Sequence, residues 1–177
     1  MKEEIKILGI SCYYHDSSAA LLINGEIASA VQEERFTRKK NDNSFPVNSI
    51  NYILKKNNLK INQIEHIVFY EKPFLKFTRL LETYLAHAPF GFASFKKAIP
   101  TWIKDKLFQK REIINELKKI DKSFNGKILF SEHHISHAAS TFYPSPFEDS
   151  LILTLDAVGE YTTSSVAVGK GNKIYFK

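Results

Sequence analysis

Two histidines at helical spacing, His133 and His137, are the side chains in this sequence best placed to do chemistry. They lie in the segment 131–139, which holds three of the six histidines of the 177-residue chain. Residues i and i+4 of a helix project from one face about 6 Å apart, so both imidazoles can bind one divalent transition metal. His134 points roughly 100° away and is not expected to share the ion. Without a further ligand, such a pair more often belongs to an ordinary helix.

The start of that helix bears on metal binding. Ser131 is expected to cap its N-terminus and Tyr143-Pro144 to end it, which gives a helix over 133–142. The positive end of the helix dipole disfavours protonated imidazole in the first turns, and only neutral imidazole binds a metal.

Asp156 is the candidate third ligand. It ends the apolar strand predicted over 151–155 and opens the loop 157–160, which contains Gly159. An Asp at the carboxyl end of a strand, beside a glycine-containing loop, is a frequent metal or phosphate position in α/β folds. Two His and one Asp suit Fe²⁺, Mn²⁺ or Zn²⁺ and leave coordination positions open. The alternative is an Asp that caps a turn.

A second polar loop, 13–18, carries His15 and Asp16. Its hydroxyl, carboxylate and main-chain N–H groups could hold a phosphate or a phosphate-bound metal, and His15 could act as acid, base or anion clamp. A surface Asx turn is equally compatible with this pattern.

The charged segment 33–40 follows the next predicted strand. Its cationic side chains could bind an acidic substrate, because guanidinium groups make bidentate contacts to phosphate or carboxylate. These side chains are Arg35, Arg38 and Lys39. A solvated loop is the more common role of such a run.

Periodicity and turn residues predict the elements that position these groups. Asn24-Gly25 predicts a tight hairpin turn. Strands are expected over 5–12, 17–23, 26–32, 64–70, 128–130, 151–155, 163–168 and 173–176, with a turn over 169–172. Helices are expected over 47–57 and 133–142, with three more between 74 and 120, separated at 89–91 and at Pro100.

Two stretches, 7–27 and 151–174, share the order strand, Asp-containing loop, strand, glycine-containing turn, strand. This similarity predicts a duplicated fold. We therefore expect a complete first lobe over 1–149 and the opening strands of a second, truncated lobe over 150–177.

Composition narrows the class of protein. The chain is 44% hydrophobic and 25% charged, as in globular proteins, and its net charge is 25 − 19 = +6. The basic residues alternate with apolar ones at helical spacing, which favours a solvated helix face over a nucleic-acid surface. The single cysteine, Cys12, excludes an internal disulfide. We expect a cytoplasmic protein without a membrane span, since neither a secretory signal nor a spanning apolar run is present.

Several blocks together resemble the N-terminal part of the O-carbamoyltransferases of nodulation-factor and antibiotic biosynthesis. The resemblance covers most of the chain, and its charged and histidine blocks are the specific ones. The blocks are Gly9-Ile10, His15-Asp16-Ser17, Ala19-Ala20-Leu21, 32–40, Phe45-Pro46, Glu132-His133-His134, 136–140, 142–147, Thr154-Leu155-Asp156 and Gly159-Glu160.

The resemblance implies an α/β fold of the actin/Hsp70/sugar-kinase type, related to the tRNA threonylcarbamoyl-transfer protein. It implies a divalent metal, with Fe²⁺ expected and Zn²⁺ or Mn²⁺ as alternatives, held by His133, His137 and Asp156. A further Asp ligand of the family has no counterpart in the 177 residues.

The resemblance also implies the reaction and its partners. In that family a YrdC-like domain makes carbamoyl-adenylate from ATP and carbamoyl phosphate, and the metal-bearing domain passes the carbamoyl group to a hydroxyl of a small-molecule or glycan acceptor. His15 and Asp16 would be catalytic. Ala157 stands where the family usually has Gly, and its Cβ could crowd a nucleotide phosphate. The implied cofactor-binding residues are Arg38, Lys39, Gly159 and Glu160.

Two other classes remain open. A sugar kinase or other phosphotransferase of the same fold would need no histidine pair. A truncated binding module would lack transfer activity. Whichever class applies, a truncated second lobe would expose apolar sheet surface, so we expect the isolated chain to self-associate or to be poorly soluble.

Overall fold

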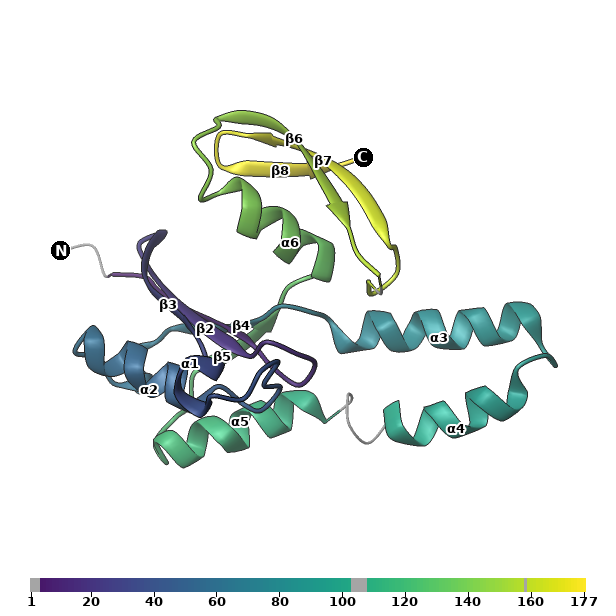
Figure 1. Ribbon diagram of the computed structural model, residues 1–177, viewed down its shortest axis with the longest axis horizontal. Helices are drawn as coiled ribbons and strands as arrows, with labels where there is room; N and C mark the ends of the chain where they lie inside the picture. Colours follow the sequence, from purple (N-terminus) through teal and green to yellow (C-terminus); the bar gives the residue numbers. More distant parts are fainter. Residues whose placement is uncertain (1–3, 103–107, 158) are drawn as a thin grey trace. The chain divides into compact units, whose positions relative to one another are not determined.

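The computed structural model describes residues 4–102, 108–157 and 159–177 (Figure 1). The chain divides into two compact units, each built from two separate segments. The first comprises Met1–Tyr70 and Gln109–Phe130, and the second comprises Glu71–Phe108 and Ser131–Lys177.

The first unit is built on a five-stranded mixed sheet with the order β3-β2-β1-β4-β5. The first three strands form an antiparallel meander, and β4 and β5 continue the sheet parallel to β1. Both central turn residues between β2 and β3, Asn24 (φ 53°) and Gly25 (φ 89°), have positive φ, which confirms the predicted hairpin turn. The strands are β1 (Lys6–Ser11), β2 (Ser18–Ile23), β3 (Glu26–Gln32), β4 (His66–Phe69) and β5 (Lys127–Phe130).

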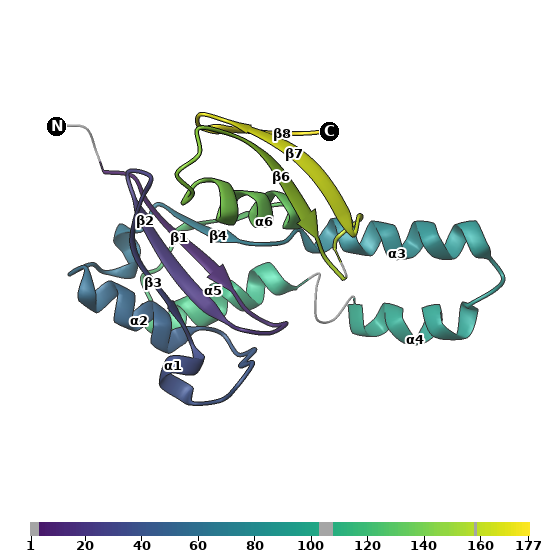
Figure 2. The same cartoon turned by 45° about the horizontal axis from the view of Figure 1, so that its top comes forward.

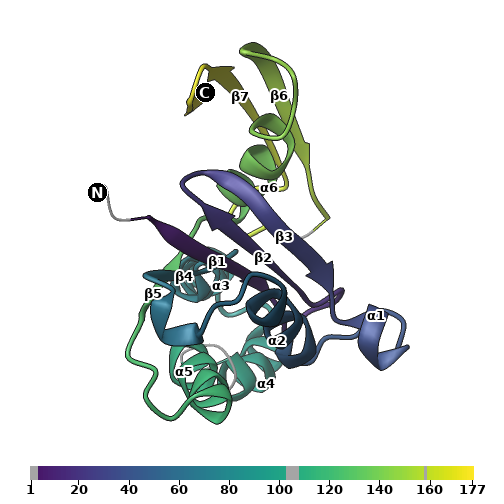
Figure 3. The same cartoon turned by 90° about the vertical axis from the view of Figure 1, so that its left-hand side faces the viewer.

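One face of this sheet forms the core of the first unit. Leu8 of β1 lies opposite Leu21 of β2 and Ile67 of β4, so the three buried side chains share a face. Helices α2 (Val47–Lys56) and α5 (Gln109–Ile120) pack on that face (Figure 3). The short helices α1 (Glu34–Thr37) and η1 (Ile61–Gln63) complete the unit.

The second unit contains a three-stranded antiparallel sheet in the order β6-β7-β8, with helix α6 packed on one face (Figure 2). A Cβ at Gly169 would collide with the ring of Phe142, so the helix approaches the strands closely there. The elements are α3 (Pro73–His87), α4 (Phe92–Trp102), α6 (His133–Phe142), β6 (Asp149–Leu155), β7 (Ser164–Lys170) and β8 (Lys173–Phe176).

The other face of this small sheet carries exposed leucines. Side chains alternate along β6: Ile152 is buried beside α6, whereas Leu151, Leu153 and Leu155 point to the opposite face and are 74%, 62% and 72% exposed. The apolar sheet surface expected from the sequence is therefore present in the structure.

Between residues 73 and 120 the described helices agree with the three that the sequence predicts, but the boundary predicted at Pro100 is wrong. Helices α3, α4 and α5 are the three expected, although residues 103–107 lie outside the described part of the chain. Pro100 was predicted to separate helices, but it lies within α4. It falls in the last turn, where a missing N–H group removes only one intrahelical hydrogen bond. The turn between β7 and β8 is also shorter than predicted, since β7 continues to Lys170.

The fold class is thus mixed α/β. A three-stranded antiparallel meander, β1–β3, begins the five-stranded sheet, and a second such meander, β6–β8, forms the whole of the three-stranded sheet. This repetition agrees with the internal similarity in the sequence. The actin/Hsp70/sugar-kinase assignment and the lobe boundary at 149/150 remain predictions. No described helix combines the length and apolar character needed to cross a bilayer.

Candidate metal centre

Helix α6 supplies two of the candidate ligands and begins differently from the prediction. The helix runs over His133–Phe142, as expected, but its N-cap residue is Glu132 rather than Ser131. Glu132 has the extended backbone of a cap residue, and its side chain makes no capping hydrogen bond. Its carboxylate is instead 2.9 Å from Nζ of Lys72. The prediction failed because a serine adjacent to a helix caps it only when its backbone occupies the N-cap position.

The third candidate ligand, Asp156, directly follows β6. Its backbone N–H donates to the carbonyl of Thr163 at 2.7 Å, which continues the β6–β7 pairing by one more bond. The end of the strand is thereby fixed, and the Asp156 side chain is directed to helix α6.

The three predicted ligands converge. Nε2 of His133 is 2.6 Å from Oδ2 of Asp156 and 3.1 Å from Nε2 of His137. Nε2 of His137 is 3.8 Å from the same carboxylate oxygen. One ligand atom from each side chain therefore lies within 4.8 Å of the other two.

These distances fit a shared divalent cation. Ligand atoms about 2.0–2.1 Å from one ion, at tetrahedral or octahedral angles, are about 2.8–3.4 Å apart. The observed separations bracket that range, and the shortest is a hydrogen bond between imidazole and carboxylate. Two imidazoles and a carboxylate are donors suited to Fe²⁺, Mn²⁺ or Zn²⁺. His133, His137 and Asp156 would hold such an ion.

The electrostatics of the cluster favour the metal-binding form of one histidine. Partial burial, and secondly the charge of His133, lower the pKa of His137 below its ordinary 6.5, although Asp156 acts in the opposite direction. Neutral imidazole is the form that coordinates a metal. The His133 and Asp156 side chains are mostly buried, whereas that of His137 is half exposed.

His134 does not join the cluster, in agreement with the helical geometry. Its ring is buried against β7, where Nδ1 lies 2.8 Å from Oγ of Ser165. This histidine attaches the helix to the sheet.

The loop after Asp156 is closely packed. A Cβ at Gly159 would collide with the carbonyl of Thr162 and approach Nε2 of His134, so this position requires glycine. The Gly159 carbonyl accepts a hydrogen bond from Arg79 of α3 at 2.6 Å. Residue 158, part of the loop singled out from the sequence, lies outside the described residues.

Glu160 carries a buried carboxylate, with 5% of the residue exposed. Its Oε2 accepts a hydrogen bond from the backbone N–H of His133 at 3.0 Å. Its Oε1 accepts one from the backbone N–H of Lys72. The nucleotide contact predicted for Gly159 and Glu160 remains a prediction.

His15 and Asp16 lie together in the first unit. His15 Nδ1 is 2.7 Å from Oδ2 of Asp16, and both side chains are substantially exposed. Asp16 has a positive φ of 49°. The loop that carries them is fixed at its ends, because the N–H groups of Tyr13 and Ser17 donate to the carbonyls of Asn43 and Asp42. Their predicted catalytic role is not tested by this geometry.

The charged segment after β3 contains a residue that sequence reasoning treated only as surface charge. Glu33 is 1% exposed, and its carboxylate accepts bonds from the backbone N–H and the side chain of both Asn48 and Ser49 at 2.7–3.0 Å. These N–H groups belong to the first turn of α2, so Glu33 caps that helix. A glutamate between Gln32 and Glu34 in a charged segment gives no local signal of this role.

The cations of the same segment lie on the surface. Arg38 ends α1 with φ 57°, and Nζ of Lys39 lies 3.9 Å from Asp42. Arg35 is 3.2 Å from Glu34. Arg38 and Lys39 belong to the first unit and Gly159 and Glu160 to the second, and a shared role in nucleotide binding stays a prediction.

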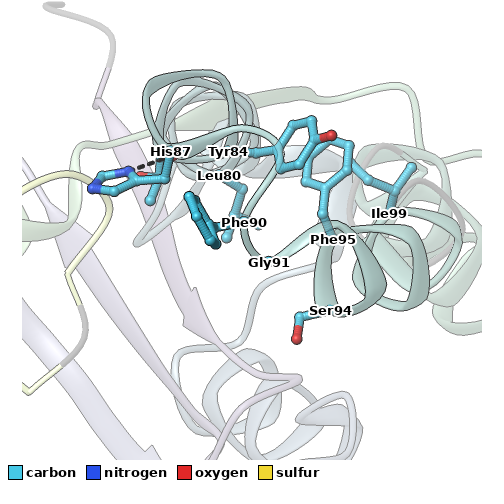
Figure 4. Close-up of a pocket in the computed structure, with 9 residues that line it drawn as sticks. Leu80, Tyr84, His87, Phe90, Gly91, Ser94, Phe95 and Ile99 are labelled. Carbon is cyan, nitrogen blue, oxygen red and sulfur yellow. Dashed lines mark hydrogen bonds between the residues drawn. The ribbon is translucent and has the colours of Figure 1, made fainter.

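A separate pocket of about 420 Å³ lies between α3 and α4 (Figure 4). Tyr84 and Phe95 stack in it with ring centroids 4.0 Å apart. None of the described residues that line it is Lys, Arg, Asp or Glu, so the described lining offers no charged side chain to a phosphate group. None of the three metal-ligand candidates contributes to it. The lining residues are Leu80, Thr83, Tyr84, His87, Phe90, Gly91, Ser94, Phe95 and Ile99.

The fold and the cluster define a mixed α/β protein with a candidate metal centre, and sequence comparison gives its family. Residues 6–177 match the family described as carbamoyltransferase N-terminus, so the chain belongs to the carbamoyltransferase family. This agrees with the resemblance drawn from the charged and histidine blocks.

Three curated relatives illustrate the relationship. An uncharacterized Synechocystis protein, sll1178, is 51% identical over 95% of this chain and 28% of its own length. Nodulation protein NolNO of Sinorhizobium fredii is 33% identical over 92% of this chain and 22% of its own length. An uncharacterized Methanocaldococcus jannaschii protein, MJ1051, is 29% identical over 95% of this chain and 25% of its own length. The chain thus spans less than a third of these relatives.

Proposed function

We propose that this chain is the metal-bearing part of an enzyme that transfers a carbamoyl group. Carbamoyl phosphate, ATP and water would give carbamoyl-adenylate, phosphate and pyrophosphate, and the carbamoyl group would then pass from the adenylate to a hydroxyl of a small-molecule or glycan acceptor. The family supports carbamoyl transfer, and the convergence of His133, His137 and Asp156 within 4.8 Å is the observation that supports the metal-dependent form.

The residues of the cluster would hold and orient the ion. His133 and His137 each present Nε2 from one helix face, and Asp156 presents Oδ2 from the end of β6. A divalent ion bound there supplies a Lewis acid for phosphate oxygens.

His15 would accept the proton of the acceptor hydroxyl. Its Nδ1 lies 2.7 Å from the Asp16 carboxylate, which can only accept, so in the neutral imidazole Nδ1 would carry the proton and Nε2 the lone pair. As the hydroxyl oxygen bonds to the carbamoyl carbon, the bond from that carbon to the adenylate oxygen breaks. AMP leaves with the electron pair, and the hydroxyl proton passes to Nε2 of His15.

The first test measures metal binding by the purified chain. Titration calorimetry with Mn²⁺ and Zn²⁺ compares the wild type with His133→Ala and His137→Ala. His87→Ala is the matched control, because His87 is an exposed histidine on α3 outside the cluster. We expect the cluster variants to lose binding by at least about 100-fold and the control to keep it. Equal affinities in all four proteins would refute the ligand assignment.

The second test separates carbamoyl transfer from the alternatives. The chain replaces the matching part of the Synechocystis relative, and the chimera is given ATP, carbamoyl phosphate and candidate hydroxyl compounds. Formation of AMP that requires carbamoyl phosphate supports the proposal. ADP formation with a sugar and without carbamoyl phosphate would indicate a kinase, and nucleotide binding without turnover would indicate a binding module.

A further inference from the structure

We propose that Glu160 is a positioning residue of the metal centre. Glu160 holds His133 against Asp156 and does not itself touch the ion. This inference rests on the proposed metal site and adds a residue to it. It differs from the nucleotide contact that the family resemblance implies for Glu160.

The N-terminus of α6 needs an acceptor from elsewhere in the chain. The first N–H groups of a helix have no intrahelical partner. The cap residue Glu132 makes no side-chain capping bond, because its carboxylate pairs with Lys72. Glu160 accepts the N–H of His133 at 3.0 Å, and its negative charge also suits the positive end of the helix.

This hydrogen bond joins the two segments that carry the ligands. His133 is the first residue of α6, and Glu160 lies four residues after Asp156 in the loop beyond β6. The hydrogen bond therefore joins the backbone of His133, one candidate ligand, to a side chain in the loop that follows Asp156, another candidate ligand. A contact there restricts the relative position of helix and loop.

The Glu160 side chain is fixed as well. Its second oxygen accepts the N–H of Lys72 immediately before α3, and the residue is 5% exposed. The adjacent Gly159 packs against His134 and accepts a bond from Arg79. Since both carboxylate oxygens of Glu160 accept backbone N–H groups, the residue acts through its neighbours rather than as a ligand.

Residues that orient metal ligands typically change metal affinity by about 10- to 100-fold when they are replaced. Glu160→Gln keeps the size of the side chain, but it removes the charge and directs an amide NH₂ group at one of the two backbone N–H groups. Metal affinity should then fall although all three ligands remain.

The experiment uses Co²⁺, whose visible absorption reports the ligand geometry, with the whole 177-residue chain. Glu132→Gln is the matched control, because it makes the same chemical change at the same helix end, on a carboxylate that bonds Lys72 Nζ instead of the backbone of α6. We expect Glu160→Gln to weaken Co²⁺ binding about 10-fold or more and to alter the spectrum. We expect Glu132→Gln to stay within about 3-fold of the wild type. Equal behaviour of the two variants, or a loss of ATP binding alone in Glu160→Gln, would overturn the proposal.

A measurement on the wild type keeps the proposal testable if Glu160→Gln does not fold. The backbone N–H of His133, an amide of the first turn, should be protected from hydrogen exchange because Glu160 accepts its bond. Rapid exchange of this amide would contradict the proposed positioning.

The outcomes separate this inference from the proposed function. If the wild type binds no Co²⁺, both are wrong. If it binds Co²⁺ through His133 and Glu160→Gln binds equally well, only the positioning role fails. If metal binding depends on Glu160 but the chimera transfers no carbamoyl group, only the proposed reaction fails.

Discussion

Nε2 of His133 lies 2.6 Å from Oδ2 of Asp156, although 23 residues separate them in the sequence. One residue begins a helix and the other follows a strand, and both elements belong to the same small α/β layer. The contact brings an imidazole nitrogen and a carboxylate oxygen together, which neither segment can achieve alone.

Replacing Asp156 with Asn should separate coordination from simple packing. The amide keeps the shape of the side chain but loses the anionic charge, so Mn²⁺ or Zn²⁺ affinity should fall by at least about 10-fold. Asp149→Asn is the control, because Asp149 is exposed at the other end of the same strand. Titration calorimetry of both variants measures the difference, and equal affinities would exclude Asp156 as a ligand.

Glu33 should stabilise the first unit through the N-terminus of α2. Glu33→Ala leaves two backbone N–H groups and two side chains without their acceptor, and hydrogen bonds to charged groups contribute about 1.5–3 kcal/mol each before coupling. We expect the free energy of unfolding to fall by about 3 kcal/mol or more in urea titrations. The neighbouring Glu34→Ala, which breaks a surface pair with Arg35, should cost less than about 1 kcal/mol. Comparable losses would show that Glu33 is not a helix cap.

Gly159→Ala should disturb the loop that follows Asp156. The new Cβ would collide with the carbonyl of Thr162, and overpacking of this kind costs about 1–3 kcal/mol. We expect a lower unfolding temperature together with weaker metal binding. Gly9→Ala is the control, since its Cβ would make only an ordinary contact of 3.8 Å with Ala20. If Gly159→Ala has the unfolding temperature and metal affinity of the wild type, the loop after Asp156 is not tightly packed at this position.

Asp42 should make stability depend on pH in acid. Hydrogen bonds from the N–H and hydroxyl of Ser44 lower the pKa of Asp42 from its ordinary 3.8 to about 2. Between these values the unfolded chain binds more protons, so the stability that Asp42 contributes is complete above pH 3.8 and is lost as the pH falls to about 2. Thermal unfolding between pH 2 and 5 should therefore be less pH-dependent in Asp42→Asn than in the wild type. If the unfolding temperature changes equally with pH in both proteins, Asp42 is not the cause of the pH dependence.

The exposed leucines of β6 should promote self-association of the chain. Leu153→Lys places a charge in the middle of this face and should raise the monomer fraction measured by light scattering over a range of concentrations. Ile27→Lys, a change at an exposed position of the first unit, should have a smaller effect. A wild-type chain that is monomeric at every concentration would contradict this prediction.

The local elements were predictable because their signals are local. The apolar spacing of α2, the Asn24-Gly25 turn and the range of α6 all follow from residues within one or two turns of each other. The spacing of His133 and His137 likewise follows from one helical turn, so their convergence needed only the correct helix assignment.

Other features depended on partners far along the chain. Ser131 predicts a local cap for α6, whereas the acceptor of the His133 N–H is the carboxylate of Glu160, 27 residues after His133. Glu33 reads as one of several charged residues, yet it is buried under α2. A carboxylate satisfies whichever N–H groups folding places beside it, and sequence spacing does not encode that proximity.

Local sequence patterns were enough to predict the helix and strand types, the family resemblance and the three candidate ligands. Asp156 and Glu160 are both acidic residues of one loop, so tertiary contacts were needed to show which carboxylate meets the candidate histidine ligands and which holds the helix. Their roles differ through burial and hydrogen-bond partners: one side chain meets imidazole nitrogens, and the other meets backbone N–H groups at two chain segments.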